Sequence, residues 1–412
     1  MTEGALPRPL REDFDGKRNG QVMWVKTLIE LYDERPLENV LGVEVFKPRV
    51  VIYICPQDIA ADALVQKKLR NYFAHRGQKV ELIFYKADIY NVRSVLDLLR
   101  MITERYGECA IDITGGTDAV LFAAGMLCAE SGHPVFTYSR KKNRFYDIKN
   151  ASFADALPCT IEYSVEDIFR MAGGSIRRGR VDNAILSEYL DDFDPFFRVY
   201  MENRREWEHI VTYIQRLSPT RPDGTYSLDA HGPYTVKGQR ASRIDAPETA
   251  LRSLEEIGLI RDLAIGGEEV SFRFRDGQIR AWLRDVGSVL ELYVYKVCLD
   301  TELFGDVRSS VIVDWDDLEE NPVSNELDVM CVRGVVPLFI SCKTCDAKTE
   351  ALNELAILRD RFGGNVARAA IVTAERGNNP LRKRGAELGI RVIDLYDLQN
   401  QRLPKRLREL MR

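Results

Sequence analysis

Short apolar runs alternate with longer amphipathic segments between about residue 21 and residue 150. The apolar runs have the length of buried strands: Val22–Leu31, Val50–Cys55, Val80–Tyr85, Ala110–Thr114 and Val135–Tyr138. The segments between them, such as Asp58–Phe73 and Ala119–Glu130, have helical length and spacing. Near-continuous apolar strands separated by helices are typical of a parallel, doubly wound sheet. We therefore predict a Rossmann-like α/β domain over residues 21–150, with a short return strand at Phe145–Ile148.

The middle of the chain, residues 151–284, has a mixed pattern. Gly173-Gly174 and the basic run Arg177–Arg180 indicate a hinge. Helical spacing follows in residues 201–216 and in Glu248–Ile257, and Val270–Phe274 alternates like a strand. A helix, a glycine that ends it and a small hairpin follow one another here. This order predicts a linker with a winged-helix-like module. Such modules are as often spacers or dimerisation elements as DNA readers.

A third α/β pattern occupies residues 285–412. Two helices are expected, at Gly287–Cys298 and at Thr349–Phe362, the second ended by Gly363-Gly364. The expected strands are Val311–Trp315, Glu326–Val332, Val335–Cys342, Ala369–Thr373 and Arg391–Asp394. The second and third of these strands form a hairpin across Arg333-Gly334. We therefore predict a second α/β domain, joined to the first by residues 151–284.

The amino-acid composition limits the number of domains and the classes of protein that the chain can represent. The 412 residues, 45% of them hydrophobic, suffice for two or three domains. The sequence has neither an 18-residue apolar stretch nor a signal-peptide pattern, which leads us to expect a cytoplasmic protein without a membrane partner. The first 20 residues are polar and are expected to be disordered or foreign to the natural protein. The eight scattered cysteines indicate reduced core thiols, and Cys342-Lys343-Thr344-Cys345 is more simply a coincidence than a zinc or redox motif.

Charge alone decides little about nucleic-acid binding. The net charge is −5, but residues 351–412 contain 13 Lys and Arg against 7 Asp and Glu. A basic end can contact phosphates, and a solvated surface helix explains the same excess equally well.

The predicted hairpin gathers polar side chains on one face. With a two-residue loop at Arg333-Gly334, Glu326 is expected opposite Ser341 and Asp328 opposite Phe339. Because side chains alternate along a strand, Glu326, Asp328, Ser341 and Lys343 then share a face, and the other face is apolar. Two carboxylates beside an ammonium suit phosphodiester hydrolysis with Mg²⁺ or Mn²⁺. Glu291 on the preceding helix can add a carboxylate, while a surface ion pair between Asp328 and Lys343 is an equally acceptable reading of the spacing.

Three short segments of this region resemble the PD-(D/E)xK pattern of restriction-endonuclease-like enzymes: Gly287–Glu291, Asn325–Val329 and Phe339–Lys343. More narrowly, they are similar to the nuclease domains of ancillary type III CRISPR proteins. The resemblance implies that Glu291, Asp328 and Lys343 are catalytic. It also implies a metal ion held by Glu291, Asp328, Glu326 and the backbone carbonyl of Cys342. Ser341 stands where the pattern has an acidic residue, so Glu326 is the expected replacement.

Three loops follow predicted strands of the amino-terminal domain, where ligands of open α/β sheets bind. Asp112–Thr117 contains a Gly-Gly pair that lets backbone N–H groups approach an anion, Cys55–Gln57 ends the second strand, and Asp33–Arg35 ends the first. The segment lacks both GxGxxG and a Walker lysine, so neither nucleotide fingerprint is met.

The Asp112–Thr117 loop, with Asn39–Gly42 and Phe46–Pro48, resembles CARF domains, which are Rossmann-like sensors of cyclic oligoadenylates. The resemblance implies a ligand site made of Arg35, Gln57, Thr114, Gly115, Gly116 and Thr117. Many CARF loops have lysine where this chain has Asp118.

A sensor joined to a nuclease implies a homodimer in type III CRISPR antiviral defence, activated by a cyclic oligoadenylate, most simply cyclic tetra-adenylate. The expected substrates are single-stranded RNA and DNA, with possible nicking of duplex DNA. One alternative is a CARF–winged-helix transcription regulator with a degenerate nuclease domain. Another is a CARF domain that slowly cleaves its own activator.

Overall fold

The computed structural model describes residues 25–177, 183–238, 242–316, 323–345 and 347–412. The chain divides into two compact units. The first comprises Met1–Ser175, Trp315–Pro322 and Asp360–Val366, and the second comprises Ile176–Asp314, Val323–Arg359 and Ala367–Arg412. The expected disorder of residues 1–20 and most of the basic run Arg177–Arg180 lie outside the described residues. Among the described helices, none has the length and apolar character needed to cross a bilayer.

The first unit is built on a six-stranded sheet in the order β3-β2-β1-β4-β5-β6. Its strands are β1 (Thr27–Leu31), β2 (Val50–Cys55), β3 (Glu81–Lys86), β4 (Cys109–Asp112), β5 (Val135–Ser139) and β6 (Arg144–Lys149). All neighbours are parallel except β5 and β6, which form an antiparallel return hairpin. The predicted doubly wound α/β sheet is therefore confirmed, including the return strand.

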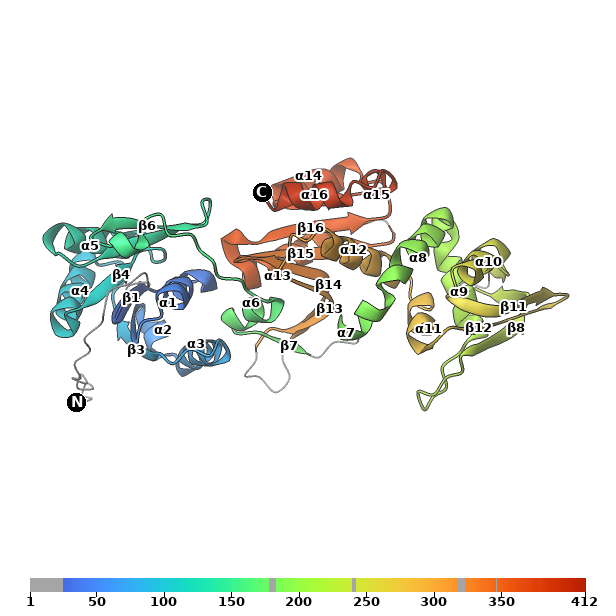
Figure 1. Cartoon of the computed structure of the whole chain (residues 1–412), viewed down its shortest axis with the longest axis horizontal. Coiled ribbons are helices and arrows are strands. Elements are labelled where there is room, and N and C mark those ends of the chain that lie inside the picture. The colour runs from blue at the N-terminus through green and yellow to red at the C-terminus, as the bar shows by residue number, and fades with distance from the viewer. Residues whose placement is uncertain (1–24, 178–182, 239–241, 317–322, 346) are drawn as a thin grey trace. The chain divides into compact units, whose positions relative to one another are not determined.

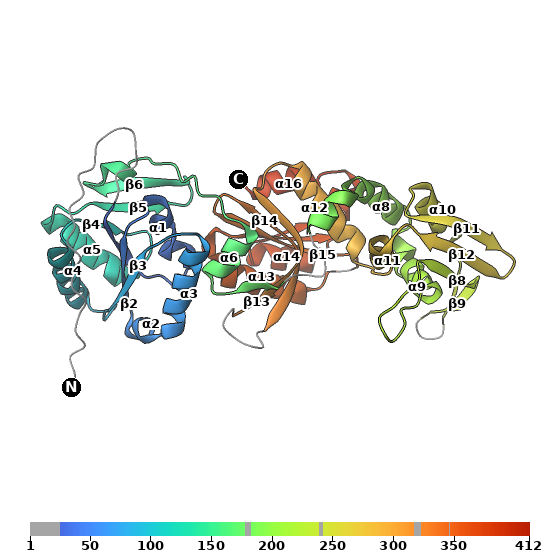
Figure 2. The same cartoon turned by 60° about the horizontal axis from the view of Figure 1, so that its bottom comes forward.

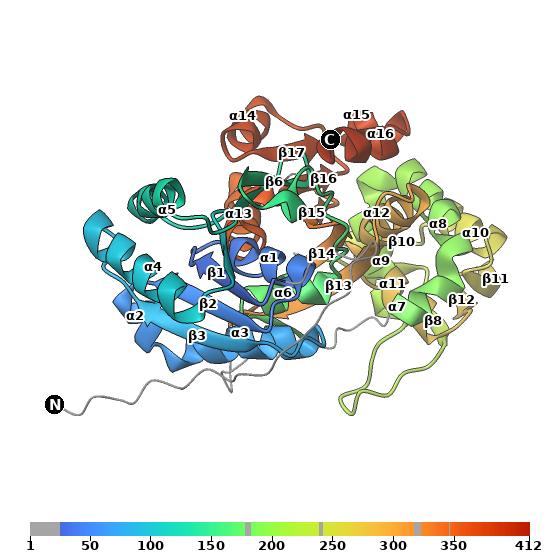
Figure 3. The ribbon, with the colours of Figure 1, turned by 60° about the vertical axis from the view of Figure 1, so that its left-hand side comes forward.

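Helices cover both faces of this sheet. On one face, α4 (Val92–Tyr106) and α5 (Asp118–Glu130) lie side by side (Figures 1 and 3) and bury Ile29, Ile52 and Ile111. On the other face lie α1 (Leu41–Phe46) and α3 (Ala63–His75), which follows the short α2 (Gln57–Ala61). Phe46 of α1 packs on Phe136 of β5, with 4.6 Å between the ring centroids. Because the central strands β1, β2 and β4 are buried on both faces, most of their residues are apolar, with the buried acids Glu30 and Asp112 as exceptions.

The second unit begins with helices and a small sheet. Its early elements are α7 (Asn183–Leu186), α8 (Leu190–Glu202), α9 (Trp207–Leu217), β8 (Asp229–Pro233), β9 (Thr235–Lys237), β10 (Arg243–Asp245), α10 (Glu248–Glu256), β11 (Ile260–Gly266), β12 (Glu269–Phe274) and α11 (Gly277–Leu283). Strands β11, β12 and β8 form one antiparallel sheet, and the β11–β12 hairpin extends beyond α9 and α10 (Figure 2). This is the expected winged-helix-like layout. The single helix expected over residues 201–216 is instead the end of α8 and a separate α9, because the chain leaves the helix at Asn203.

The remainder of the second unit is a mixed sheet in the order β17-β16-β15-β14-β13-β7. Its strands are β7 (Ser175–Arg177), β13 (Asp306–Asp314), β14 (Ser324–Arg333), β15 (Val336–Lys343), β16 (Arg368–Thr373) and β17 (Ile390–Ile393). Its helices are α12 (Ser288–Asp300), α13 (Thr349–Gly363), α14 (Asn379–Glu387), α15 (Leu395–Gln399) and α16 (Leu403–Leu410), and the last three gather near β16 and β17 (Figure 1). The apolar side of α12 packs on Val329, Leu338 and Ile340 of the central strands.

The β14–β15 hairpin has a different register from the predicted one. Arg333 pairs with Val336 and Val329 with Ile340, so the two-residue turn is Gly334-Val335. Gly334 has φ +59° and Val335 is not among the residues with positive φ. A turn with positive φ only at its first central residue favours glycine at that position. The predicted loop at Arg333-Gly334 placed glycine second, and its pairing of Asp328 with Phe339 and of Glu326 with Ser341 is wrong.

Candidate functional site

Asp328 lies on β14 where the pairing of this strand is interrupted on both sides. The β14–β15 ladder ends at the Val329–Ile340 pair, and the β13–β14 ladder skips the position of Ser310. In place of a ladder bond, the Cys342 N–H donates to Asp328 Oδ2 at 2.5 Å, and the Ser341 hydroxyl donates to the same oxygen at 3.1 Å. These contacts hold the carboxylate in one orientation between the two strands.

Lys343 ends β15 beside this carboxylate. Its Nζ lies 3.5 Å from Asp328 Oδ2, and its side chain is 36% exposed, against 17% for Asp328. The two strands therefore bring together Asp328, Ser341 and Lys343 on one face, as the alternation of side chains predicted. An ammonium with solvent access next to an oriented carboxylate can receive a phosphate group.

Glu326 occupies a different place from the one expected. It is exposed, and it accepts a hydrogen bond from the hydroxyl of Ser310 on β13. Ser310 has φ +53°, a conformation that costs a non-glycine residue roughly 1–3 kcal/mol. Glu326 therefore does not face Ser341, whose hydroxyl contacts Asp328. The sequence carries no sign of the left-handed serine, which is why this pairing was missed.

Glu291 lies in the first turn of α12, close enough to the β14–β15 hairpin for the charged groups of the hairpin to change its pKa. Burial, and then the charges of Asp328, Asp285 and Glu326, raise the pKa of Glu291 to about 8 against an opposing effect of Lys343. Asp285 lies just before this helix, and its Oδ2 accepts the N–H groups of Gly287 at 3.0 Å and Ser288 at 2.7 Å. Asp285 was missed, although an acidic residue three positions before a serine at a helix start is a recognisable capping pattern.

The donor set is suited to a hard divalent cation. Within the described residues, no three His, Cys, Asp or Glu side chains converge into a ready metal-binding group. Several carboxylates nevertheless lie near Glu291, and a bound cation would reduce the repulsion between their charges. Carboxylate oxygens are also the ligands that Mg²⁺ and Mn²⁺ prefer. Glu291 and Asp328 fit such a role as they stand, whereas Glu326 is engaged by Ser310.

The amino-terminal loop Asp112–Thr117 lies at the carboxyl end of β4, next to β1. The sheet order reverses at β1, and such a switch point is where ligands bind in open α/β sheets. Gly116 has φ +98° and its N–H donates to Asp33 Oδ2 at 3.1 Å, across the gap from β4 to the end of β1. A Cβ on Gly115 would lie 2.8 Å from the Leu31 carbonyl oxygen, so this approach requires glycine.

The threonines of this loop have separate tasks. The Thr114 N–H donates to Asp112 Oδ1 at 2.8 Å, its hydroxyl donates to the same oxygen, and its oxygen accepts the Tyr138 N–H at 2.9 Å. Thr117 is exposed before the first turn of α5, with its hydroxyl 3.4 Å from the Ile89 carbonyl oxygen. Thr114 therefore shapes the loop, and Thr117 faces solvent at a helix start.

Arginines from two other segments approach this loop. Arg35 binds Asp33 with both Nε, at 2.7 Å, and Nη2, at 2.6 Å. Arg140, in the β5–β6 turn, pairs with buried Glu38, and its Nε is buried without a hydrogen-bond partner among the described residues. Burial and then the charge of Arg35 lower the pKa of Arg140, so the two guanidinium groups lie near each other. Arg140 was not among the ligand residues predicted from the sequence, because it lies outside the three loops that follow the predicted strands.

Gln57 is the remaining expected ligand residue. It is the first residue of α2, directly after β2, and its side chain is exposed. Strands β2, β1 and β4 are neighbours and parallel, so Gln57, Arg35 and the Gly-Gly loop lie at the same edge of the sheet. The loops chosen from the sequence are therefore brought together at one edge.

Comparisons with known proteins agree with this description. Residues 280–412 match the family model described as "Card1-like, endonuclease domain". No curated protein sequence matches the chain. Two solved structures are similar over almost the whole length. Protein VC1899 from Vibrio cholerae has a TM-score of 0.73 at 19% identity, covering 93% of this chain and 97% of that one. Can2 from Sulfobacillus thermosulfidooxidans, solved in complex with cyclic tetra-adenylate, has a TM-score of 0.66 at 17% identity, covering 94% and 99%.

The family match agrees with the nuclease resemblance expected for the carboxy-terminal domain, and the two solved structures show that the fold of the whole chain is shared with Can2 and VC1899. The matched segment contains α12, the β14–β15 hairpin and every proposed catalytic side chain. Residues 280–412 of this chain are therefore similar to the Card1-like endonuclease domain.

Proposed function

We propose that this chain is a metal-dependent nuclease whose active site is formed by Asp328 and Lys343, and that a cyclic oligoadenylate bound at the β4–α5 loop activates it. The observation that carries the proposal is the 3.5 Å approach of Lys343 Nζ to Asp328 Oδ2 inside a domain of an endonuclease family. The proposed substrates are single-stranded RNA and DNA, with nicking of duplex DNA as a further activity.

The side chains have complementary tasks in phosphodiester hydrolysis. The Lys343 ammonium can compensate negative charge on a phosphate oxygen and orient the attacking water. Asp328 is held by Ser341 and by the Cys342 N–H, so little reorganisation is required when a substrate arrives. Ser341 therefore acts on Asp328 as a positioning residue in place of the acidic residue of the general pattern.

Glu291, Asp328 and the backbone carbonyl of Cys342 would hold a Mg²⁺ or Mn²⁺ ion, and Glu326 would join them after releasing Ser310. A bound divalent cation would supply charge stabilisation to the phosphate oxygens. The raised pKa of Glu291 supports this assignment. Burial and nearby carboxylates disfavour the ionised form of Glu291, and a bound cation would stabilise that form.

The amino-terminal unit is the proposed sensor, with residues 21–150 as its CARF domain. Arg35, Gln57, Thr114, Gly115, Gly116 and Thr117 would contact the ligand, together with Arg140. The fold shared with Can2, which was solved with cyclic tetra-adenylate, supports that ligand as the activator. Residues 151–284 would transmit the signal to the nuclease domain, residues 285–412. For a switch, the ligand must bind the active arrangement more tightly than the inactive one.

A cleavage assay tests both parts of the proposal. Purified chain and Mn²⁺ are mixed with fluorescent single-stranded DNA, single-stranded RNA or covalently closed duplex circles, with and without cyclic tetra-adenylate. We expect cleavage of the single strands with activator and at least tenfold less without it. Equal cleavage in both arms would refute activation. Sequence-selective duplex binding without cleavage in any arm would favour a winged-helix transcription regulator.

Site variants separate the chemistry from activation. Asp328→Ala and Lys343→Ala should each lower single-turnover cleavage at least about 100-fold, because each removes a charged group from the reacting centre. Both should bind cyclic tetra-adenylate with unchanged affinity. The exposed Lys79→Ala in the first unit is the matched control and should cleave normally. A fully active Lys343→Ala protein would disprove the site.

A further inference from the structure

Helix α8, in the linker region, contacts both elements that carry the proposed active site. It packs on α12, the helix of Glu291 (Figure 1), where the ring of Phe197 stacks on that of Tyr293 with 3.6 Å between the centroids. Asp194 of α8 also pairs with Lys296 of α12 at 3.1 Å. The last turn of α8 reaches the segment that follows Lys343 at the end of β15. One helix therefore touches both halves of the site.

The backbone from Lys343 to Cys345 is held by three hydrogen bonds. The Ala374 N–H donates to the Lys343 carbonyl oxygen at 2.9 Å, and the Thr373 hydroxyl donates to the Cys345 carbonyl oxygen at 3.2 Å. The carbonyl oxygen of the residue between them accepts from the hydroxyl of Tyr200 at 3.5 Å. Two of the three donors thus come from the end of β16, and the third comes from α8.

Tyr200 is well placed to fix this segment. Its side chain is fully buried, and its ring packs on those of Phe197 and Trp207, with 5.9 and 5.4 Å between the centroids. Neighbouring rings restrict the orientation of the tyrosine and hence the position of its hydroxyl. A buried hydroxyl needs a hydrogen-bond partner, and the Thr344 carbonyl oxygen supplies one.

An ion pair ties the linker to the same place. Arg204, in the short turn that follows α8, pairs with Glu375, which lies two residues beyond the end of β16. The side chain of Arg204 is only 14% exposed. The Glu375 N–H donates at 3.2 Å to the Thr373 hydroxyl, the group that in turn binds Cys345. Arg204 and Tyr200 therefore act on one small region of backbone.

We propose that Tyr200 and Arg204 are positioning residues of the nuclease, and that through them the linker sets the position of Lys343. The inference rests on the proposed nuclease function and deepens it, because it names contacts by which α8 acts on the active site. Lys343 Nζ lies 3.5 Å from Asp328 Oδ2. A small shift of the backbone that carries Lys343 moves this ammonium away from a bound phosphate, and such misplacement slows the chemical step.

Steady-state cleavage of single-stranded DNA by the full chain, with Mn²⁺ and saturating cyclic tetra-adenylate, tests Tyr200. Tyr200→Phe keeps the ring and removes only the hydroxyl, so we expect kcat to fall about fivefold with KM nearly unchanged. Tyr213→Phe is the matched control, because Tyr213 is equally buried in this unit and its hydroxyl donates to a backbone carbonyl, that of Pro233, at 3.0 Å. Both variants should lose similar melting temperature, and the control should keep its kcat.

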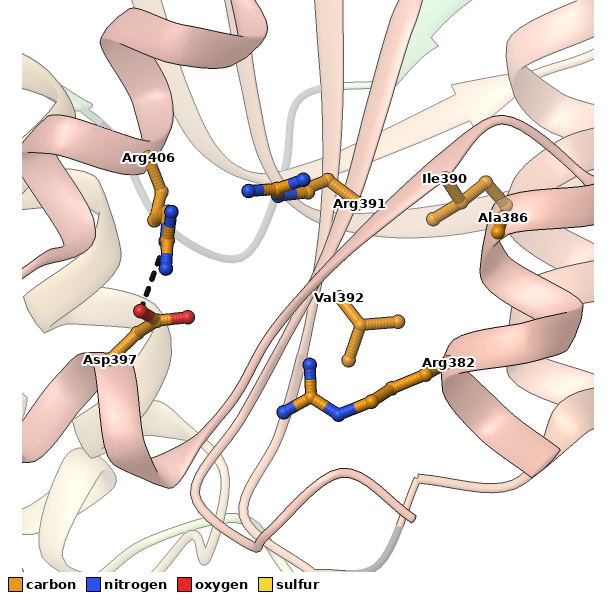
Figure 4. A pocket seen from close by; sticks show the side chains of 7 residues that line it. All are labelled: Arg382, Ala386, Ile390, Arg391, Val392, Asp397 and Arg406. Carbon is orange, nitrogen blue, oxygen red and sulfur yellow. Dashed lines mark hydrogen bonds and ion pairs between the residues drawn. The ribbon is translucent and has the colours of Figure 1, made fainter. Parts of the chain in front are cut away.

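A double-mutant cycle tests the ion pair. Arg204→Ala and Glu375→Ala should each lower kcat about tenfold, and the double variant should be no slower than either single variant. Arg204→Lys should recover part of the rate. Arg406→Ala is the control, since Arg406 pairs with Asp397 at 3.0 Å in a pocket of about 240 Å³ at the outer edge of β17 (Figure 4). This variant should cleave normally.

The outcomes separate this inference from the proposed function. If the unmodified chain cleaves and Tyr200→Phe and Arg204→Ala lower kcat no more than their controls, positioning by α8 is wrong and the nuclease proposal stands. If the unmodified chain cleaves no strand, the proposed function fails and the inference fails with it. A raised KM with unchanged kcat in Arg204→Ala would also overturn the inference, because Arg204 would then contact the substrate strand directly. Effects of Arg204→Ala and Glu375→Ala that multiply in the double variant would show that the two residues do not act as a pair.

Discussion

At the scale of single residues, buried acids have the largest physical consequences. Glu30 and Asp112 are neighbours in register on β1 and β4, and each is only 1% exposed. Neither oxygen of Glu30 has a hydrogen-bond partner among the described residues. Burial raises the pKa of Asp112 to about 7 and, with the nearby Asp112 charge, raises that of Glu30 well above its ordinary value. The pair therefore favours its protonated form in the folded protein.

This pair predicts a pH-dependent stability. The pKa of Asp112 is about 7 in the folded chain against 3.8 ordinarily, so its stabilising effect is complete below about pH 4 and is lost as the pH rises through 7. Asp112→Asn removes the charge and its Oδ1 can still accept from Thr114. We expect its melting temperature to exceed that of the unmodified protein by roughly 5 °C at pH 8 and to match it only near pH 4.

Thermal unfolding monitored by circular dichroism between pH 4 and pH 8 measures this difference. Asp118→Asn, at an exposed position in the first turn of α5, is the control and should run parallel to the unmodified protein. If the melting temperature of the Asp112→Asn protein also changes with pH in parallel with that of the unmodified protein, Asp112 does not titrate in this pH range.

At the scale of elements, the β4–α5 loop depends on one backbone conformation. Gly116 has φ +98°, and a Cβ at this position would lie 2.9 Å from the Cβ of Leu31. Its N–H also joins the loop to Asp33. Any side chain here must strain or displace the loop.

Gly116→Ala should therefore weaken the binding of cyclic tetra-adenylate by about tenfold or more, since the strain is roughly 1–3 kcal/mol. At saturating activator the cleavage rate should be retained, because the nuclease site is unchanged. Isothermal titration measures the first quantity and single-turnover cleavage the second. Gly125→Ala, in the middle of α5 with nothing near its missing Cβ, is the matched control and should bind normally. Equal affinities of the two variants would remove this loop from the ligand site.

At the scale of the whole molecule, the proposal requires two chains. A cyclic tetra-adenylate is a symmetric ring, and a two-fold pair of sensor units presents the same residues to both of its halves. Sedimentation equilibrium should give twice the mass of one chain, and titration should give one activator per two chains. Arg35→Ala should lower the affinity without changing the mass. A monomer that binds one ring per chain would contradict the symmetric site.

Much of the fold follows from pattern alone. The strand Val50–Cys55 has the predicted bounds, because its apolar run ends at Pro56, and the doubly wound sheet follows from runs that are apolar on both faces. Period-two alternation was also sufficient to place Asp328, Ser341 and Lys343 on one face. These features depend on the order of apolar and polar residues along a short segment, so the sequence of that segment determines them.

The sequence by itself thus determined the two α/β sheets, the loops at the edge of the proposed sensor site and the residues on the proposed catalytic face. Only the tertiary structure decided the pairing across the hairpin, the engagement of Glu326 by Ser310, and the approach of Arg140 to Arg35. The physical reason is the same in each case. A backbone conformation such as the positive φ of Gly334 or Ser310, or a contact between distant segments, is selected by packing of the whole sheet, and no pattern along the chain encodes it.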